Sequence, residues 1–103
     1  MEQPVAMTID KELADGKLTL KVCGRLDTNT SPKLEEELKL GEVLEVAFDF
    51  TGLEYISSAG LRVLMNVYKG MMASGGRMVV LNPNETVKGV FDMTGLGEMF
   101  NLT

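Results

Sequence analysis

The hydrophobic period of this chain switches several times between two and about 3.6 residues, and this switching limits the fold more than any other feature. Residues 6–13 and 18–26 alternate apolar and polar side chains, as half-buried strands do. Between them, Asp15-Gly16 predicts a tight hairpin. A later segment has helical spacing, with its apolar residues at Leu61, Leu64, Met65, Tyr68 and Met72. Strands that alternate with helices favour parallel pairing through right-handed crossovers, and the hairpin makes the sheet mixed.

The segment that follows the hairpin predicts a helix and then a strand. Ser31 is a plausible N-cap before Pro32, and Gly41 is expected to end this helix. The next run predicts a strand with one apolar face, which contains Leu44, Val46, Phe48 and Phe50. Its other face is also partly apolar, which favours a central position under helices.

Residues 77–82 read as a short buried strand, and residues 83–95 as a helix. Asn84 is the expected N-cap of this helix and Gly95 its expected end. Residues 96–103 are a candidate for one more short strand. The order is therefore β-β-α-β-α-β-α. We expect one α/β domain over residues 1–103, built as a single mixed sheet of four to five strands with helices packed against it.

The composition excludes several functions. Fifteen acidic against ten basic residues give a net charge of −5, which argues against nucleic acid and against anionic membrane surfaces as partners. No apolar run approaches 18 residues, and the N-terminal segment lacks a secretion leader, so we expect a cytoplasmic protein with no membrane insertion. Histidine is absent, which removes the commonest metal ligand and general base. We therefore expect no metal, no cofactor and no enzymatic activity. Cys23 fits a small strand residue in a reducing compartment.

Two adjacent serines, Ser57 and Ser58, stand between the central strand and the helix that begins near Leu61. In open α/β sheets, functional surface gathers where strands lead into helices. A hydroxyl at a helix start lies beside unpaired N–H groups and the positive end of the helix dipole, a setting that tolerates a phosphate. From the residues alone two interpretations stay open. Either a serine merely caps the helix, or one of them is reached and modified.

Four longer segments follow one another along the chain: GRLDTNTSPKLEEEL, FDFTGLEYISSAGLRVLMNVYKG, GGRMVVLN and VKGVFDMTGLGEMFNL. In this order and spacing they are similar to the STAS domain family, and most of all to its stand-alone anti-sigma factor antagonists. The resemblance covers nearly the whole chain. It implies a binding regulator without a cofactor.

The resemblance further implies a mechanism called partner switching. The unphosphorylated antagonist binds an anti-sigma factor that is also a serine kinase, and a sigma factor is released. Phosphorylation abolishes this binding, and a PP2C-type phosphatase reverses it. By its place in YISSAGL, the phosphorylated serine corresponds to Ser58. Ser57, which stands where the family usually has aspartate, is the second choice. The alternative function is a STAS interaction subunit of a lipid or anion transport complex, or of a signalling scaffold.

We predict a docking face that combines the start of the central helix with the loop GRLDTNTS. Its residues are Ser57, Ser58, Ala59, Gly60 and Arg62 from the helix, and Asp27, Thr28 and Asn29 from the loop. Gly60 is expected to let another chain approach closely, and the loop residues to supply polar contacts. Two rival functions have little support. No Ser-His arrangement can form in this chain, and no glycine-rich loop is present to hold a nucleotide phosphate.

Overall fold

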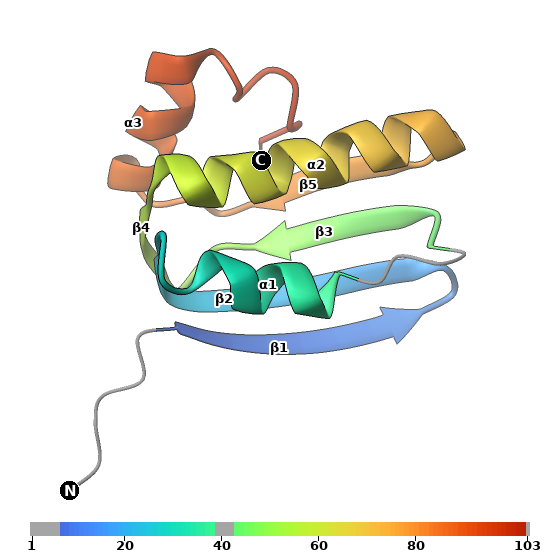
Figure 1. The fold of residues 1–103 in the computed structure, drawn as a ribbon. Coiled ribbons are helices and arrows are strands. Elements are labelled where there is room, and N and C mark those ends of the chain that lie inside the picture. Colours follow the sequence, from blue (N-terminus) through green and yellow to red (C-terminus); the bar gives the residue numbers. More distant parts are fainter. Residues whose placement is uncertain (1–6, 39–42, 103) are drawn as a thin grey trace, which may run out of the picture.

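The structure is a computed structural model that describes residues 7–38 and 43–102 of the chain. Its elements follow one another as β1 (Met7–Ala14), β2 (Lys17–Leu26), α1 (Ser31–Glu37), β3 (Glu45–Asp49), β4 (Leu53–Ile56), α2 (Ser58–Ser74), β5 (Arg77–Leu81) and α3 (Glu85–Thr94). Figure 1 shows that α2 runs along the sheet, while α3 lies near the end where α2 begins.

All five strands belong to one mixed sheet, as the sequence predicts. The order is β1-β2-β3-β5, and β4 also pairs with β2. β1 and β2 are antiparallel, whereas the pairs β2–β3, β2–β4 and β3–β5 are parallel. The hairpin turn lies at Asp15 and Gly16, with φ angles of 52° and 79°. Positive φ at both positions is what a tight two-residue hairpin turn requires, so the Asp-Gly prediction is confirmed.

The sequence interpretation missed one strand. The sequence predicts a single central strand before the helix, but the structure has two, because β3 ends at Asp49 and β4 is a separate strand. β2 is long enough to serve both, because its first half pairs with β3 and its second half, from Gly24 to Leu26, pairs with β4. The register shifts between Gly24 and Arg25. As a result β4, and not β3, leads into α2.

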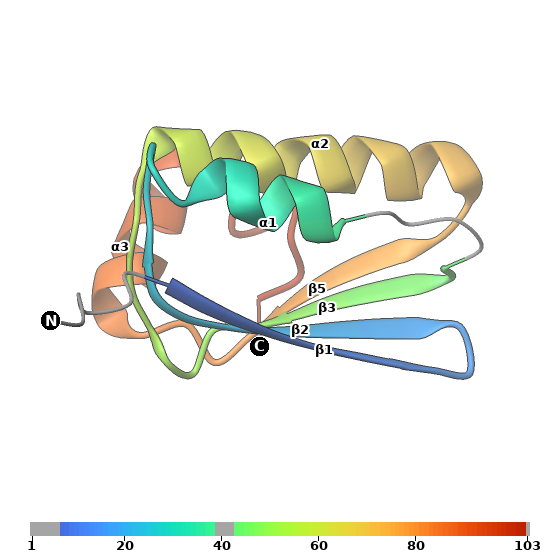
Figure 2. The same cartoon turned by 60° about the horizontal axis from the view of Figure 1, so that its bottom comes forward.

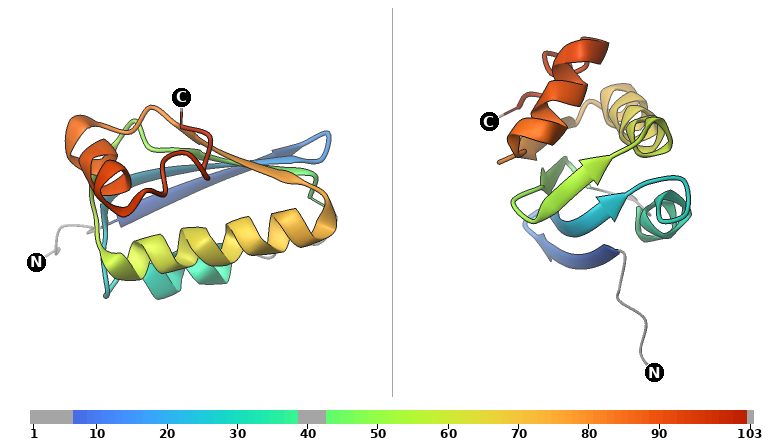
Figure 3. Two further views of the ribbon diagram at one scale, coloured as in Figure 1. Left: turned by 90° about the horizontal axis from the view of Figure 1, so that it is seen from above. Right: turned by 90° about the vertical axis from the view of Figure 1, so that its left-hand side faces the viewer.

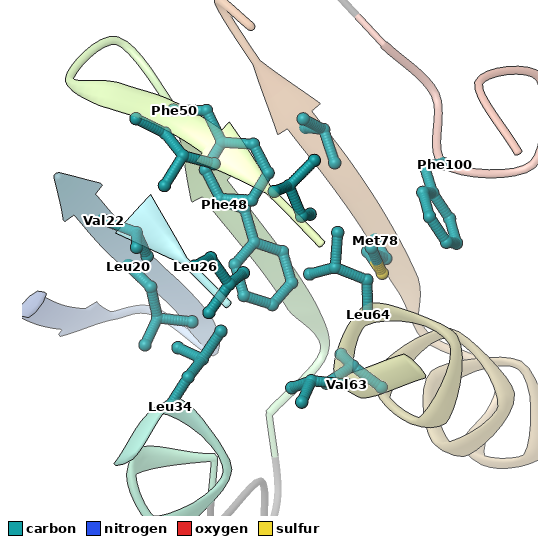
Figure 4. Close-up of a cluster of buried hydrophobic side chains, with 14 of the residues drawn as sticks. Leu20, Val22, Leu26, Leu34, Phe48, Phe50, Val63, Leu64, Met78 and Phe100 are labelled. Atoms are coloured by element: carbon teal, nitrogen blue, oxygen red, sulfur yellow. The ribbon is translucent and has the colours of Figure 1, made fainter. Parts of the chain in front are cut away.

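Helices α1 and α2 cover one face of the sheet, and the core lies between these helices and the sheet (Figures 2 and 4). Figure 4 shows Phe48 between the labelled side chains of β2 and Leu64 of α2, with Phe50 next to Phe48. The opposite face is not covered by α1 or α2 and carries a ladder of charges, since Glu45 pairs with Lys17 on one side and with Arg77 on the other. β3 is therefore central, as expected, but the helices cover only one of its faces.

Two residues of the predicted apolar faces lie outside the core. Met72 is 57% exposed, and Met71, which is 2% exposed, faces the sheet in its place. Both positions fit a helical stripe that starts at Leu61 and Leu64, because Met71 lies seven residues after Leu64 and Met72 eleven residues after Leu61. Leu44 is 68% exposed, because it precedes β3 and does not share the buried face of Val46.

The described ends of α1 and α3 lie at or within one residue of the predicted positions. Asn84 caps α3 by accepting a hydrogen bond from the Val87 N–H at 2.8 Å, and Gly95 follows α3 with φ of 74°. For α1, Thr30 and not Ser31 is the N-cap, a difference of one residue. The predicted end at Gly41 lies outside the described residues. Residues 96–102 form no strand; within them, Leu102 makes an isolated bridge to Val80.

Candidate docking and phosphoacceptor site

The site lies at the edge of the sheet where β2 and β4 end and α2 begins. The right-hand view of Figure 3 looks onto this edge. Leu26 and Ile56 are register partners at the ends of the two parallel strands. Immediately after them, the Ser57 N–H donates to the Leu26 carbonyl oxygen at 2.8 Å. This bond holds the start of α2 directly against the start of the Asp27 loop, so the structure brings together the two halves of the predicted docking face.

Ser57 is the N-cap of α2. Its backbone is extended, with φ of −99° and ψ of 176°, and its Oγ accepts from the Gly60 N–H at 3.4 Å. Its carbonyl oxygen accepts from the Leu61 N–H at 3.0 Å. The capping interpretation of the serine pair therefore holds for Ser57, whose hydroxyl has a structural task.

Ser58 has a different environment. It is the first residue of α2, it is exposed, and no hydrogen bond to its hydroxyl is found among the residues that the structure describes. The first turn of α2 carries no acidic side chain. A negative charge added here would therefore meet the helix dipole without a competing carboxylate on the same turn.

Gly60 has a role that the sequence did not reveal. It is buried, and a Cβ atom there would lie 2.8 Å from Leu26 Cγ and 2.9 Å from Ile56 Cγ1. Real carbon atoms do not approach so closely. The missing side chain therefore lets α2 lie close to the ends of β2 and β4. We expected this glycine to leave room for another chain. The space that a Cβ would occupy is instead filled by the domain's own core, at Leu26 and Ile56.

The loop before α1 is held in shape by its own polar groups. One carboxylate oxygen of Asp27 accepts from the N–H groups of Asn29 and Thr30 at 2.9 Å and 3.1 Å. The Thr30 hydroxyl accepts from the Asp27 N–H and donates to the Arg25 carbonyl, both at 2.8 Å. Desolvation raises the pKa of Asp27, but the bonds from Thr30 and Asn29 outweigh it, so the pKa lies below the ordinary 3.8. Asp27 is therefore ionised at neutral pH, while Thr28 and Asn29 are exposed.

Two further residues at this edge, Arg25 and Tyr55, are not among the predicted contact residues, although Arg25 lies in the loop GRLDTNTS. The Arg25 guanidinium lies 4.6 Å from the centroid of the Tyr55 ring, and its Nε lies 4.0 Å from Asp27 Oδ2. Arg25 and Tyr55 are register partners on β2 and β4. Only their positions next to LDT and ISS could have pointed to them. Arg62, by contrast, is exposed on α2 as expected for a contact residue.

The described residues contain neither a metal-binding cluster nor a membrane-spanning helix. The chain has no histidine, and the described residues contain no group of three acidic or cysteine side chains that could hold a metal ion. Within the same residues, no helix has both the length and the apolar character needed to cross a bilayer. The described residues thus form an α/β domain in which the exposed Ser58 hydroxyl, the ionised Asp27 and the exposed Arg62 lie at the edge where α2 begins.

Comparison with known proteins identifies this class. A model of the STAS domain matches residues 8–103, so the chain belongs to the STAS domain family. It is 26% identical over 95 residues to the anti-sigma-B factor antagonist of Listeria monocytogenes, which covers 89% of this chain and 83% of that protein. It is 29% identical over 94 residues to the anti-sigma F factor antagonist of Paenibacillus polymyxa, which covers 87% of this chain and 80% of that protein.

Solved structures show the same fold. The unphosphorylated anti-sigma factor antagonist SpoIIAA superposes with a TM-score of 0.82 at 23% identity, over 93% of this chain and 88% of that one. SpoIIAA of Bacillus in its phosphorylated form superposes with a TM-score of 0.75 at 22% identity, over 93% and 91% of the two chains. The predicted family and fold are therefore confirmed.

Proposed function

We propose that this protein is an anti-sigma factor antagonist whose docking is controlled by phosphorylation of Ser58. In its unphosphorylated form it binds an anti-sigma factor that is also a serine kinase, and this binding frees a sigma factor in the cytoplasm. Phosphorylated Ser58 abolishes the binding, and a PP2C-type phosphatase restores it. The protein itself is a binding regulator and not an enzyme, as are the antagonists that it resembles.

The observation that carries this proposal is the exposed, unengaged hydroxyl of Ser58 on the first residue of α2. The neighbouring Ser57 is half-buried, and its Oγ caps the helix, so its modification would remove the cap. The two serines thus differ in accessibility and in what each modification would disturb. This difference favours Ser58 as the phosphoacceptor even though Ser57 replaces the usual aspartate of the family.

In the proposed reaction the Ser58 Oγ attacks the γ-phosphorus of ATP and ADP leaves, while the hydroxyl proton passes to the kinase. The product carries about −1.5 to −2 charges at neutral pH. Facing a partner carboxylate at roughly 6 Å, this charge would cost about 1 to 5 kcal/mol, for effective dielectric constants between about 80 and about 20. Every 1.4 kcal/mol is about tenfold in affinity, so strong release needs no refolding.

Mass spectrometry tests the modification. The protein is incubated with its cognate anti-sigma factor and ATP, in parallel with Ser58→Ala and Ser57→Ala. We expect one phosphate on the unsubstituted protein and on Ser57→Ala, and none on Ser58→Ala. Phosphate on neither serine would contradict the proposal.

Binding measurements test the switch. Ser58→Ala removes the phosphoacceptor and leaves the surface uncharged, so it should bind the anti-sigma factor as the unsubstituted protein does. Ser58→Asp places a negative charge at the same point and should bind at least ten times more weakly. Equal affinities of the two variants would show that charge at this position does not control docking.

A further inference from the structure

Ser58 and Arg62 lie four residues apart at the start of α2 and therefore project from the same side of the helix. Both are exposed, whereas Gly60 and Leu61 between them are buried and Ala59 is half-buried. The helix therefore begins with one hydroxyl and one guanidinium side by side on its solvent face. No other charged residue occurs between Ser57 and Asn66.

The other two arginines of the chain are held by their own domain. Arg25 lies over the Tyr55 ring and near Asp27, and Arg77 Nε lies 3.2 Å from Glu45 Oε1. For Arg62 no ion pair is found within residues 7–38 and 43–102. This guanidinium is available to a phosphate placed one helical turn before it.

We propose that Arg62 is the intramolecular partner of the phosphate on Ser58, an inference that rests on the proposed function. Residues at i and i+4 have Cβ atoms about 6 Å apart, and pairs with the anion on the N-terminal side are the favoured orientation. Arginine binds phosphate through charge-assisted hydrogen bonds, often two at once. The geometry of α2 therefore suits this pair without any change of backbone.

The pair gives phosphorylation two effects on the docking face. It adds negative charge at Ser58, and it withdraws the Arg62 guanidinium from contact with a partner. A partner carboxylate that faces Arg62 in the unmodified complex then meets an ion pair with a net negative charge. Arg62 is thus a positioning residue of the switch as well as a contact residue of the unmodified form.

Titration by ³¹P NMR tests the pair without a kinase, on protein with phosphoserine incorporated at position 58 during synthesis. A nearby guanidinium favours the dianionic phosphate, so it lowers the second phosphate pKa from its usual value near 6. Arg62→Gln should raise this pKa by about 0.3 pH unit, the equivalent of an exposed helical ion pair of roughly 0.4 kcal/mol. Arg62→Lys should restore most of the shift. Arg77→Gln, the same charge change at the opposite edge of the sheet, should leave the pKa unchanged.

Charged groups on the elements around this site do not disturb the comparison. Asp27 on the loop, Glu54 on β4 and Glu35 on α1 are present in every variant, so their contributions to the phosphate pKa cancel. A second readout is the Arg62 Nε–H resonance, which should move as the phosphate titrates. Equal phosphate pKa values with and without Arg62, or an Arg62 Nε–H chemical shift that stays constant while the phosphate titrates, would overturn the inference. Failure of the proposed function would appear elsewhere, as a Ser58 that the kinase does not modify.

Discussion

Replacing Gly60 by alanine should destabilise the domain, although alanine is the better helix former. A Cβ at this position would lie 2.8 Å from Leu26 Cγ and 2.9 Å from Ile56 Cγ1. Carbon atoms pack at about 3.5–4.0 Å, so either α2 or the strand ends must move by roughly 0.7 Å or more. Both neighbours are at most 1% exposed, so their side chains have no free space into which to turn.

The magnitude follows from two opposing terms. Overpacking a close-packed core costs about 1–3 kcal/mol, and replacing glycine by alanine within a helix gains up to about 1 kcal/mol. The same helix supplies a matched control, because a Cβ at Gly70 would have no heavy atom within 4 Å. Gly70→Ala should therefore stabilise by up to about 1 kcal/mol. The difference between the two variants removes the helix term and isolates the packing cost of about 1–3 kcal/mol.

Urea unfolding of both variants and of the unsubstituted protein gives the free energies of unfolding directly. A difference of 1 kcal/mol also moves the melting temperature by roughly 4–8 °C in a domain of this size. We expect Gly60→Ala to melt below Gly70→Ala by at least that amount. If Gly60→Ala were as stable as Gly70→Ala, the close approach of α2 to β2 and β4 would not be the reason for this glycine.

Ser57→Ala should cost about 1 kcal/mol of unfolding free energy, because the cap of α2 is lost, whereas Ser58→Ala should stay within about 0.5 kcal/mol; equal losses would contradict the capping assignment. Met71→Ala should cost about 2–5 kcal/mol, and Met72→Ala, on the exposed side of the helix, less than about 0.5 kcal/mol by the same measurement. Hydrogen bonds from the Thr51 hydroxyl and the Thr51 backbone N–H lower the pKa of Asp49 below 3.8. Its stabilising effect, which solvent screening keeps below about 1 kcal/mol, should thus be present above that pH and vanish as the pH falls through the lowered pKa. An Asp49→Ala variant whose deficit stays constant from pH 7 to about pH 2 would refute this.

Elements with strong local chemistry were predictable from the sequence. The hairpin at Asp15-Gly16 and the cap at Asn84 depend on residues that are neighbours along the chain, and the structure has both. β4 was not predictable in this way. Its four residues form a separate strand only because the second half of β2 is free to pair with them. That pairing joins distant segments and leaves no periodic signal in so short a run.

The candidate site likewise has features that the sequence predicts and features that depend on contacts between distant segments. That the Asp27 loop and the serine pair meet at one edge followed from the rule that parallel strands end together, and the bond between Ser57 N–H and the Leu26 carbonyl confirms it. The function of Gly60 did not follow, since its neighbours come from two strands. A glycine beside a candidate binding residue suggests an open surface, and only the packing shows that the space is already filled.

This packing bears on how the proposed switch works. The backbone of Ser57 is bonded to β2, its side chain caps α2, and Gly60 seats the first turn on the strand ends. None of these contacts uses the Ser58 hydroxyl. A phosphate on Ser58 would therefore change the charge of the surface while the contacts that place the helix remain, which favours direct exclusion of the partner over refolding. Amide spectra of the phosphorylated and unmodified forms should then differ around the start of α2 and the Asp27 loop, and changes spread through the sheet would refute direct exclusion.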